Sequence, residues 1–394
     1  EVFAKALRGF VDFDRMLVFT TPEAHTTTWP VLAELNDARI REIPITIGAS
    51  NEEMWKLFDA VISQINEGET VIFDITHGLR SIPFLAFLFA AYLKTAKQVT
   101  IEAIYYGAFE LGDEKKDIPA PVIDLSEYVT MLDWITATDQ FVQTGNAIRL
   151  ANLLESREKN AAEALRSVSR AAFLTQPFSL SKEAQKLQAE LKKAASSFVH
   201  TSQPFTILAE KVVQTFTPFV LPEEISKDVP VPFEAGEELL SREWDLIEWY
   251  YSHGQWMQAL TLAREFLVDL VTCKVGNEID LKPENRNMVE RGITGVFKIG
   301  KKFRDEFGEE RLYTESDLNR FGAKFYETHP NAQEIATLFD TFSTLRNQLN
   351  HAEHKKDALR FSKLVQKIPQ ELEKVRQLFH NSNNFYASRQ KKAR

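Results

Sequence analysis

Short apolar runs alternate with helical patterns over the first third of the chain. Strands are predicted at 16–19, 43–47, 71–75 and 100–106, where apolar, β-branched or aromatic residues follow one another. Helices are predicted near the start, ending about Gly9, and at 29–38, 52–65 and 82–96. This alternation is typical of a parallel sheet with helices on both faces. Because such sheets usually begin with a strand, we expect a first strand and its loop to precede Glu1 outside this sequence.

After Pro121 the strand signals stop and helical patterns take over. Residues 127–216 are rich in Ala, Leu, Glu, Lys and Gln, which favour helices, and the stretch 216–236 carries four prolines among acidic residues. Further helices are predicted at 255–271, 332–355 and 357–379. We therefore predict an α/β domain at 1–125, a helical connector at 126–236 and an all-α domain at 237–394.

Composition and charge narrow the functional classes. The chain has 394 residues, of which 44% are apolar and 26% charged, so it can bury a sizeable core and is unlike a disordered chain. Its net charge of −9 argues against a protein that coats nucleic acid through bulk positive charge. From His351 onward, however, eleven Lys and Arg face four acidic residues, so a local nucleic-acid site is compatible with the charge distribution.

The cysteine content and the lengths of the apolar runs indicate the cellular compartment of the protein. A single cysteine, Cys273, can form neither an intramolecular disulfide nor a cysteine-based zinc site, and we interpret it as a small buried side chain on a helix. The longest apolar run, 82–93, is well short of the ~20 residues that a membrane span needs. No signal peptide is recognisable. We expect a cytoplasmic protein without a membrane partner.

A polar loop follows the strand at 71–75 and leads into a helix that has Pro83 in its first turn. Its residues include Thr76, His77, Gly78, Arg80 and Ser81. Free backbone N–H groups at a helix start, together with an arginine fork, suit a phosphate or the edge of a nucleotide. The alternative is that the hydroxyl groups only cap the helix and the histidine makes a structural hydrogen bond.

A second polar loop, 20–28, follows the strand at 16–19 and contains Thr20 and Thr21. Because both loops follow strands of one parallel sheet, they should lie near each other at its carboxyl edge. A helix-capping role for the threonines is the alternative to ligand contact. The glycine spacing of a Walker loop or of a dinucleotide-binding fingerprint is absent from both loops.

A group of uncharged polar and basic residues shares one side of the helix predicted at 332–355. Successive residues of a helix turn by about 100°, which places five side chains in one wedge and an apolar stripe opposite. The wedge contains Arg346, Asn347, Asn350, His351 and His354, and the stripe contains Leu338, Phe342, Leu345, Leu349 and Ala352. A wedge of Arg, Asn and His without a carboxylate suits the binding of a phosphodiester.

This set of side chains is sufficient for RNA cleavage without a metal. Histidine can transfer protons near neutral pH, and arginine can stabilise negative charge that develops on phosphorus. Arg346 and His351 lie at opposite edges of the wedge, so a homodimer that packs two such helices together would bring two Arg–His pairs into one cleft. A structural role for His351 at an interface is the alternative. The other histidines lack metal-ligand spacing, and we propose no metal and no cofactor.

Taken together, the two motifs resemble a known family. The run from Asp74 to Pro83, DITHGLRSIP, is similar to the ligand loop of CARF domains, the CRISPR-associated Rossmann-fold sensors. The run from Arg346 to His351, RNQLNH, is similar to the catalytic motif of HEPN ribonucleases. In this order on one chain, they resemble the CARF–HEPN effector ribonucleases of type III CRISPR systems. The resemblance implies an α/β Rossmann-like N-terminal domain, then an all-α HEPN domain.

The resemblance also implies an activity and its regulation. Members of the family bind a cyclic oligoadenylate at the dimer interface of their sensor domains, and this activates the HEPN dimer to cut single-stranded RNA, leaving a 2′,3′-cyclic phosphate. Arg346 and His351 would be catalytic, with Asn347 supporting them. Thr76, His77, Gly78, Arg80 and Ser81 would contact the cyclic ligand, and we add Thr20 and Thr21 from the neighbouring strand end. This makes the expected protein an antiviral, allosterically activated endoribonuclease.

A second hypothesis is a non-catalytic sensor of the same type, whose helical domain binds nucleic acid or protein as a regulator. The polar wedge could serve binding alone, although no basic recognition helix is clear in the sequence. A nucleotide-modifying enzyme is a weaker alternative, because no catalytic carboxylate or metal set is recognisable. RNA digestion in EDTA, with and without cyclic oligoadenylates, discriminates between cleavage and binding.

Overall fold

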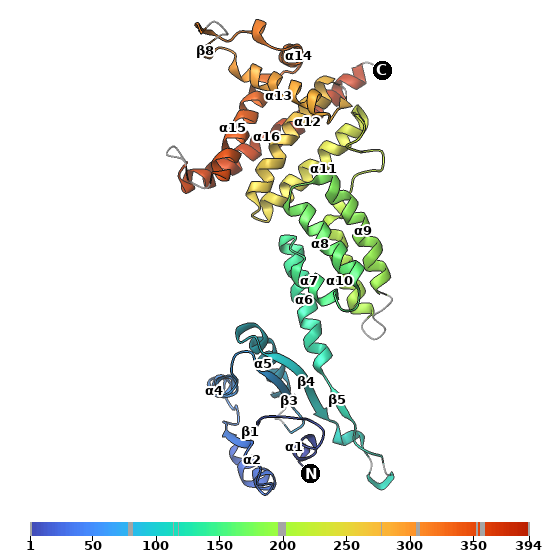
Figure 1. The fold of residues 1–394 in the computed structure, drawn as a ribbon, viewed down its shortest axis with the longest axis vertical. Coiled ribbons are helices and arrows are strands. Elements are labelled where there is room, and N and C mark those ends of the chain that lie inside the picture. Colours follow the sequence, from blue (N-terminus) through green and yellow to red (C-terminus); the bar gives the residue numbers. More distant parts are fainter. Residues whose placement is uncertain are drawn as a thin grey trace. The chain divides into compact units, whose positions relative to one another are not determined.

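The computed structural model describes residues 2–77, 82–112, 114–116, 118–195, 202–276, 278–304, 308–351, 354 and 359–392. The chain divides into two compact units, Glu1–Thr136 and Ala137–Arg394, which are described separately (Figure 1). The first is a mixed α/β unit and the second is almost entirely helical. Both agree with the predicted classes of secondary structure, while a further division of the second unit at 236 stays a prediction.

The first unit alternates strands and helices, as predicted. Its elements are α1 (Phe3–Leu7), β1 (Met16–Thr20), α2 (Pro22–Thr27), α3 (Trp29–Ala33), β2 (Ile40–Pro44), α4 (Asn51–Ser63), β3 (Thr70–Asp74), α5 (Ile82–Ala96), β4 (Thr100–Gly107), β5 (Val122–Asp124) and the first part of α6 (Ser126–Thr144). β1 pairs with β2 and β3 with β4, both in parallel, which confirms the parallel pairing. Among the described residues no ladder joins β1 to β3, so the strands form two small sheets.

Three details of this unit differ from the sequence prediction. β5 was not predicted, and it pairs antiparallel with the end of β4 directly after Pro121. The helix predicted at 29–38 ends at Ala33, because Asn36 adopts a left-handed backbone conformation with φ of 51° that cannot continue a helix. The strand predicted at 43–47 lies at Ile40–Pro44, where it pairs with the full length of β1.

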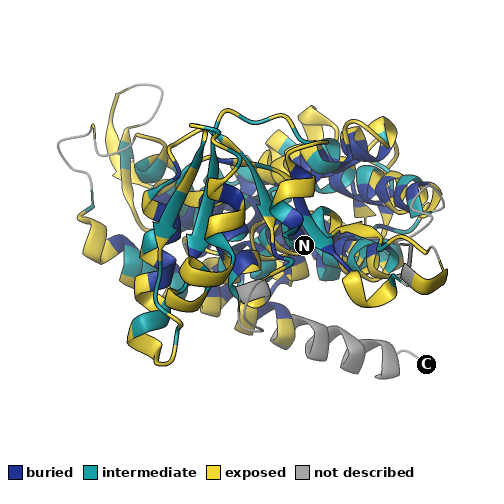
Figure 2. Cartoon of the chain, turned by 90° about the horizontal axis from the view of Figure 1, so that it is seen from below, coloured by how far each residue is buried: buried dark blue, intermediate teal, exposed yellow. Residues whose placement is uncertain are grey.

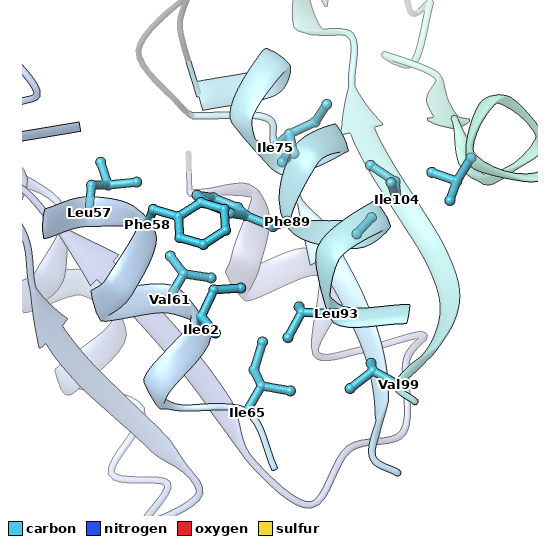
Figure 3. Packing of buried hydrophobic residues seen from close by; sticks show 13 residues of the cluster. Leu57, Phe58, Val61, Ile62, Ile65, Ile75, Phe89, Leu93, Val99 and Ile104 are labelled. Carbon is cyan, nitrogen blue, oxygen red and sulfur yellow. The ribbon is translucent and has the colours of Figure 1, made fainter. Parts of the chain in front are cut away.

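One face of the strands is covered by α4 and α5, whose apolar side chains form a common core (Figure 3). Phe58 of α4 packs against Phe89 of α5 with ring centroids 5.3 Å apart, and Ile104 of β4 joins the same cluster. α5 has the predicted bounds, and its Ala90 and Leu93 are fully buried. This packing fixes the helix that follows the polar loop after β3.

The opposite face is covered by α1. Because side chains alternate along a strand, Tyr105 and Gly107 of β4 point away from Ile104 and its cluster. The ring of Phe10, just after α1, lies 6.2 Å from that of Tyr105, and a Cβ at Gly107 would stand 2.9 Å from the ring of Phe3. Glycine at 107 therefore lets α1 pack closely, and the predicted two-sided covering of the strands is confirmed at β4.

The second unit is built from helices. They are the remainder of α6, α7 (Ile148–Leu154), α8 (Lys159–Phe173), α9 (Pro177–Ala195), α10 (Ser202–Phe216), α11 (Phe233–Ser252), α12 (Trp256–Gly276), α13 (Pro283–Lys298), α14 (Arg320–Thr328), α15 (Ala332–Asn350) and α16 (Phe361–Lys392). Two short antiparallel pairs were not predicted: β6 (Val231–Pro232) with β7 (Glu278–Ile279), and β8 (Lys302–Arg304) with β9 (Glu310–Leu312). The region expected to be all-α, 237–394, is therefore helical but also contains β7, β8 and β9, and β7 pairs with β6 of the predicted connector.

α12 is the central helix of this unit. Every residue from Phe266 to Val275 is buried, including the charged Asp269 and Lys274. Figure 2 shows by colour how far the residues along the chain are buried. The helix packs against α11, α13, α15 and α16. Charged side chains are rarely buried unless they are paired, and Lys274 accordingly meets Glu237 of α11 at 2.7 Å. The partners of Asp269 lie beneath the Arg–Asn–His motif.

Candidate functional site

The Arg–Asn–His motif lies at the carboxyl end of α15. Asn347 and His351 are exposed and Arg346 is partly buried, while Phe342 and Leu345 on the other side of the helix are buried in the core. The predicted division of this helix into an apolar stripe and a polar side is confirmed for these residues. The structure thus brings Arg346, Asn347 and His351 onto one short stretch at the end of one helix.

The helix is shorter than predicted. It ends at Asn350 and not at 355, and His351 is its capping residue. The amide of His354 donates to the carbonyl of His351 at 2.8 Å, and His354 itself is not helical. Helical arithmetic therefore does not extend to His354, and its place in the wedge is wrong. Ala352, assigned to the apolar stripe, lies outside the described residues.

Arg346 faces a carboxylate on a neighbouring helix. Its Nη1 lies 3.8 Å from Oε1 of Glu265 on α12. The Nε of Arg346 is buried and has no hydrogen-bond partner among the described residues. A separation of 3.8 Å is an ion pair without a hydrogen bond, so among the described residues no partner occupies the Nη donors that an anion could reach.

Glu265 belongs to a network of charged side chains from three helices. Its Oε1 accepts a hydrogen bond from Arg264 at 2.6 Å, and its Oε2 accepts one from Arg286 of α13 at 2.5 Å. Arg264 also bonds to Glu290 of α13 at 2.6 Å. Burial opposes ionisation of Glu265, but the arginines outweigh it, so its pKa lies below the ordinary value. Glu265 is therefore a carboxylate held in place from both sides.

The network ends in a buried pair of acids. Arg286 donates to Asp269 at 2.6 Å, and Glu243 of α11 stands beside Asp269 with its Oε2 buried and without a partner among the described residues. Burial, together with the charge of Asp269, raises the pKa of Glu243 well above its ordinary value. The pKa of Asp269 is also raised by burial, but the charge of Arg286 and the hydrogen bond with Glu243 lower it. The proton of the pair therefore resides on Glu243 and forms the hydrogen bond to Asp269.

This network was not predicted from the sequence. The helix at 255–271 was predicted from its apolar pattern alone, without regard to the charged residues within it. The available signal was the run of Arg264, Glu265 and Asp269 in a helix otherwise rich in leucine and valine. A buried helix that carries such charges needs partners, but their identity depends on the packing of α11, α13 and α15.

At the end of β3, the structure places Thr76 and His77 in contacts with their own unit. The Thr76 hydroxyl accepts the amide of Gly107 at 2.8 Å, which ties the carboxyl ends of β3 and β4 together. The His77 ring is exposed, its Nε2 accepts the amide of Phe3 at 3.2 Å, and it stacks on Phe109. Gly78, Arg80 and Ser81, the other candidate contacts of this loop, lie outside the described residues.

Thr20 and Thr21 also have structural partners. The buried hydroxyl of Thr20 donates to Glu42 at 2.6 Å, and the same carboxylate oxygen lies 2.7 Å from Nδ1 of His25. The hydroxyl of Thr21 accepts the amide of Ala24 and caps α2. The contact of Thr21 is the one expected if this threonine only caps a helix. The contacts of Thr20 and His25 identify Glu42 as a further polar group beside the loop.

The remaining features considered are the single cysteine, possible metal ligands and possible membrane-spanning helices. Cys273 is buried on α12, as interpreted from the sequence, and burial raises the pKa of its thiol to about 12. In the part of the chain that the structure describes, no three His, Cys, Asp or Glu side chains are grouped to hold a metal ion. Within those same residues, no helix combines the length and the apolar character needed to cross a membrane.

Comparison with known proteins finds similarity in part of the chain. Residues 130–219, which run from α6 into η3 (Thr217–Phe219), match the model of the second domain of the CRISPR-associated protein MJ1674. The protein of that name from Methanocaldococcus jannaschii is 34% identical to this chain over 129 residues, which are 32% of this chain and 20% of the relative. The aligned part thus spans a fifth of that relative. Over these residues, the chain is similar to a CRISPR-associated protein.

Proposed function

We propose that the chain is a cyclic-oligoadenylate-activated endoribonuclease that cuts single-stranded RNA in type III CRISPR antiviral defence. The observation that carries this proposal is the placement of Arg346, Asn347 and His351 together at the end of α15, with the histidine exposed and the arginine partly buried. Its support is the chemistry of these side chains, the motif resemblance and the match to a CRISPR-associated protein. The Rossmann-like sensor and the HEPN fold belong to the same proposal.

The proposed reaction uses the 2′-hydroxyl of the RNA as nucleophile. The 2′-oxygen forms a bond to the adjacent phosphorus while the bond to the 5′-oxygen breaks, which gives a 2′,3′-cyclic phosphate and a 5′-hydroxyl. His351 takes the proton of the nucleophile or supplies one to the leaving oxygen, and Arg346 stabilises the negative charge on phosphorus. A homodimer would supply a second histidine, so that one acts as base and the other as acid.

For the activator, we propose the carboxyl ends of β1 and β3 as the binding region. Thr20, Thr21, Thr76 and His77 lie there, and ligands of open α/β sheets bind at this edge. A cyclic oligoadenylate carries phosphates and adenine edges, which match the exposed imidazole of His77 and the guanidinium of Arg80, while the threonines shape the ends of the strands. Ligand binding would favour the dimer geometry that cuts.

The test is RNA digestion in EDTA with and without cyclic oligoadenylates of several ring sizes. We expect activator-dependent cleavage by the natural protein and at least a roughly hundredfold loss for His351→Ala, with activator binding unchanged. His380→Ala, which alters an exposed histidine on α16, is the matched control and should retain activity. Cleavage by His351→Ala at the natural rate would contradict the catalytic assignment, and RNA binding without cleavage would favour the regulator hypothesis.

A further inference from the structure

We propose that Glu265 is the positioning residue that holds the Arg346 guanidinium in its working orientation. This inference rests on the proposed function and adds a residue of α12 to the site on α15. Glu265 would act through Arg346 and would not touch RNA itself. The inference rests on the contact between the two side chains, in which Oε1 of Glu265 lies 3.8 Å from Nη1 of Arg346.

The Glu265 carboxylate is suited to this role because its own position is fixed. Arg264 bonds to one oxygen and Arg286 to the other, at 2.6 and 2.5 Å. Arg264 is itself oriented by the Ser343 hydroxyl at 3.2 Å and by the ring of Phe339, both on α15. The anion that Arg346 meets is thus tied to the helix that carries Arg346, and its place does not depend on Arg346.

The contact orients Arg346 without using up its donors. At 3.8 Å the attraction is between charges, and the buried Nε has no hydrogen-bond partner among the described residues. The Nη groups make no hydrogen bond to a described residue either, so a phosphate oxygen can bond to them without first displacing a carboxylate. Arg346 is therefore directed by Glu265 and still available to an anion.

The charged side chains that hold Glu265 in place are carried by long, packed helices. Glu243 on α11, Asp269 on α12 and Arg286 on α13 continue the network behind Glu265, and all three helices are at least 16 residues long. Groups held by packed helices are placed more accurately than groups on loops. A displacement of about 1 Å at a catalytic group can cost about a hundredfold in rate, which sets the scale of the expected effect.

The substitution Glu265→Gln tests the inference. We expect kcat for activator-stimulated RNA cleavage to fall roughly 10- to 100-fold, while KM changes less than about threefold, because the neutral amide no longer directs Arg346. Glu265→Asp, which keeps the charge on a shorter side chain, should recover part of this loss in kcat. The control is Glu248→Gln, which removes an exposed carboxylate of α11 that pairs with Arg376 outside the network.

A double-mutant cycle in urea unfolding provides a readout that does not need activity. Glu265→Gln, Arg346→Gln and the double variant should shift the unfolding midpoint non-additively, because the two side chains interact. Additive shifts, or a kcat of Glu265→Gln within about twofold of the natural protein, would overturn the inference. If the natural protein cleaves no RNA, the proposed function is wrong. The double-mutant cycle in urea then still tests whether Glu265 holds Arg346.

Discussion

At the scale of single residues, one proton balances the charges beneath Arg346. With Glu243 protonated, the remaining carboxylates and the guanidiniums of the network are equal in number. The carboxylates are Glu265, Asp269 and Glu290, and the guanidiniums are Arg264, Arg286 and Arg346. A partly buried cluster of this kind is tolerable because its members are paired, and removing one partner leaves a charge uncompensated.

Isosteric substitutions of the buried acid pair should therefore differ in effect. Glu243→Gln keeps a donor toward Asp269, so we expect a loss of less than about 1 kcal/mol in the free energy of unfolding at pH 7. Asp269→Asn removes the counter-charge of Arg286 and should cost roughly 3–5 kcal/mol. Urea unfolding measures both. Equal losses would show that the proton is not held by Glu243.

The same pair predicts the pH dependence of stability. The pKa of Glu243 is raised in the folded protein, so its protonation contributes stability that is complete below the unfolded value of about 4.5 and is lost as pH rises through the folded pKa. We expect Glu243→Gln to gain stability relative to the natural protein as pH increases from about 5. A difference that stays constant from mildly acidic to mildly alkaline pH would contradict this assignment.

The sequence alone could predict part of this site. Arg346, Asn347 and His351 follow from local spacing on one helix, and their placement was predicted. The network of Glu265 could not be predicted, because its members come from α11, α12, α13 and α15 and meet only through tertiary packing. His354 was misplaced because the turn after Asn350 depends on hydrogen bonds that a helical repeat does not encode.

At the scale of elements, α1 can pack closely on β4 because the residue at position 107 is glycine and has no side chain. Gly107 gives room to the ring of Phe3, and the amide of Phe3 bonds to His77 at the proposed activator region. Parallel strands and the helix α5 were predicted because their apolar runs are long and regular. β5 was missed because it is three residues long and is defined by its pairing with β4.

Filling this space should loosen α1. Gly107→Ala places a methyl group 2.9 Å from the Phe3 ring, and we expect a loss of about 1–3 kcal/mol in the free energy of unfolding. Gly276→Ala is the control, since no atom lies within 4 Å of its added Cβ. In the Phe3→Ala background, Gly107→Ala should cost less than in the natural protein. If Gly107→Ala lowers the free energy of unfolding equally in both backgrounds, residue 107 does not act through contact with the Phe3 ring.

At the scale of the whole molecule, the charge is unevenly distributed. The chain carries −9 in total, while the residues from His351 onward include eleven basic and four acidic residues. The basic excess thus follows the proposed catalytic motif directly in the sequence. RNA that approaches the motif would release counterions from its backbone as it meets this segment.

Removal of residues 388–394 should weaken RNA binding in a salt-dependent way. The deletion removes Arg389, Lys391, Lys392 and Arg394, and the slope of log affinity against log salt falls by about 0.7 for each phosphate of a single strand that is no longer neutralised. We expect the slope to decrease by up to about 3, measured by fluorescence anisotropy with 2′-O-methyl RNA between roughly 50 and 300 mM salt. An unchanged slope would show that this tail does not contact RNA.

The two small sheets of the first unit each present an open edge. β1 pairs only with β2, and β3 only with β4, among the described residues, and their apolar side chains, among them Val18 and Ile72, are only partly buried. Rows of unused N–H and C=O groups beside apolar side chains form a template for strand addition. Pairing with a further extended segment would use these N–H and C=O groups, and it would add a strand without needing new side-chain contacts.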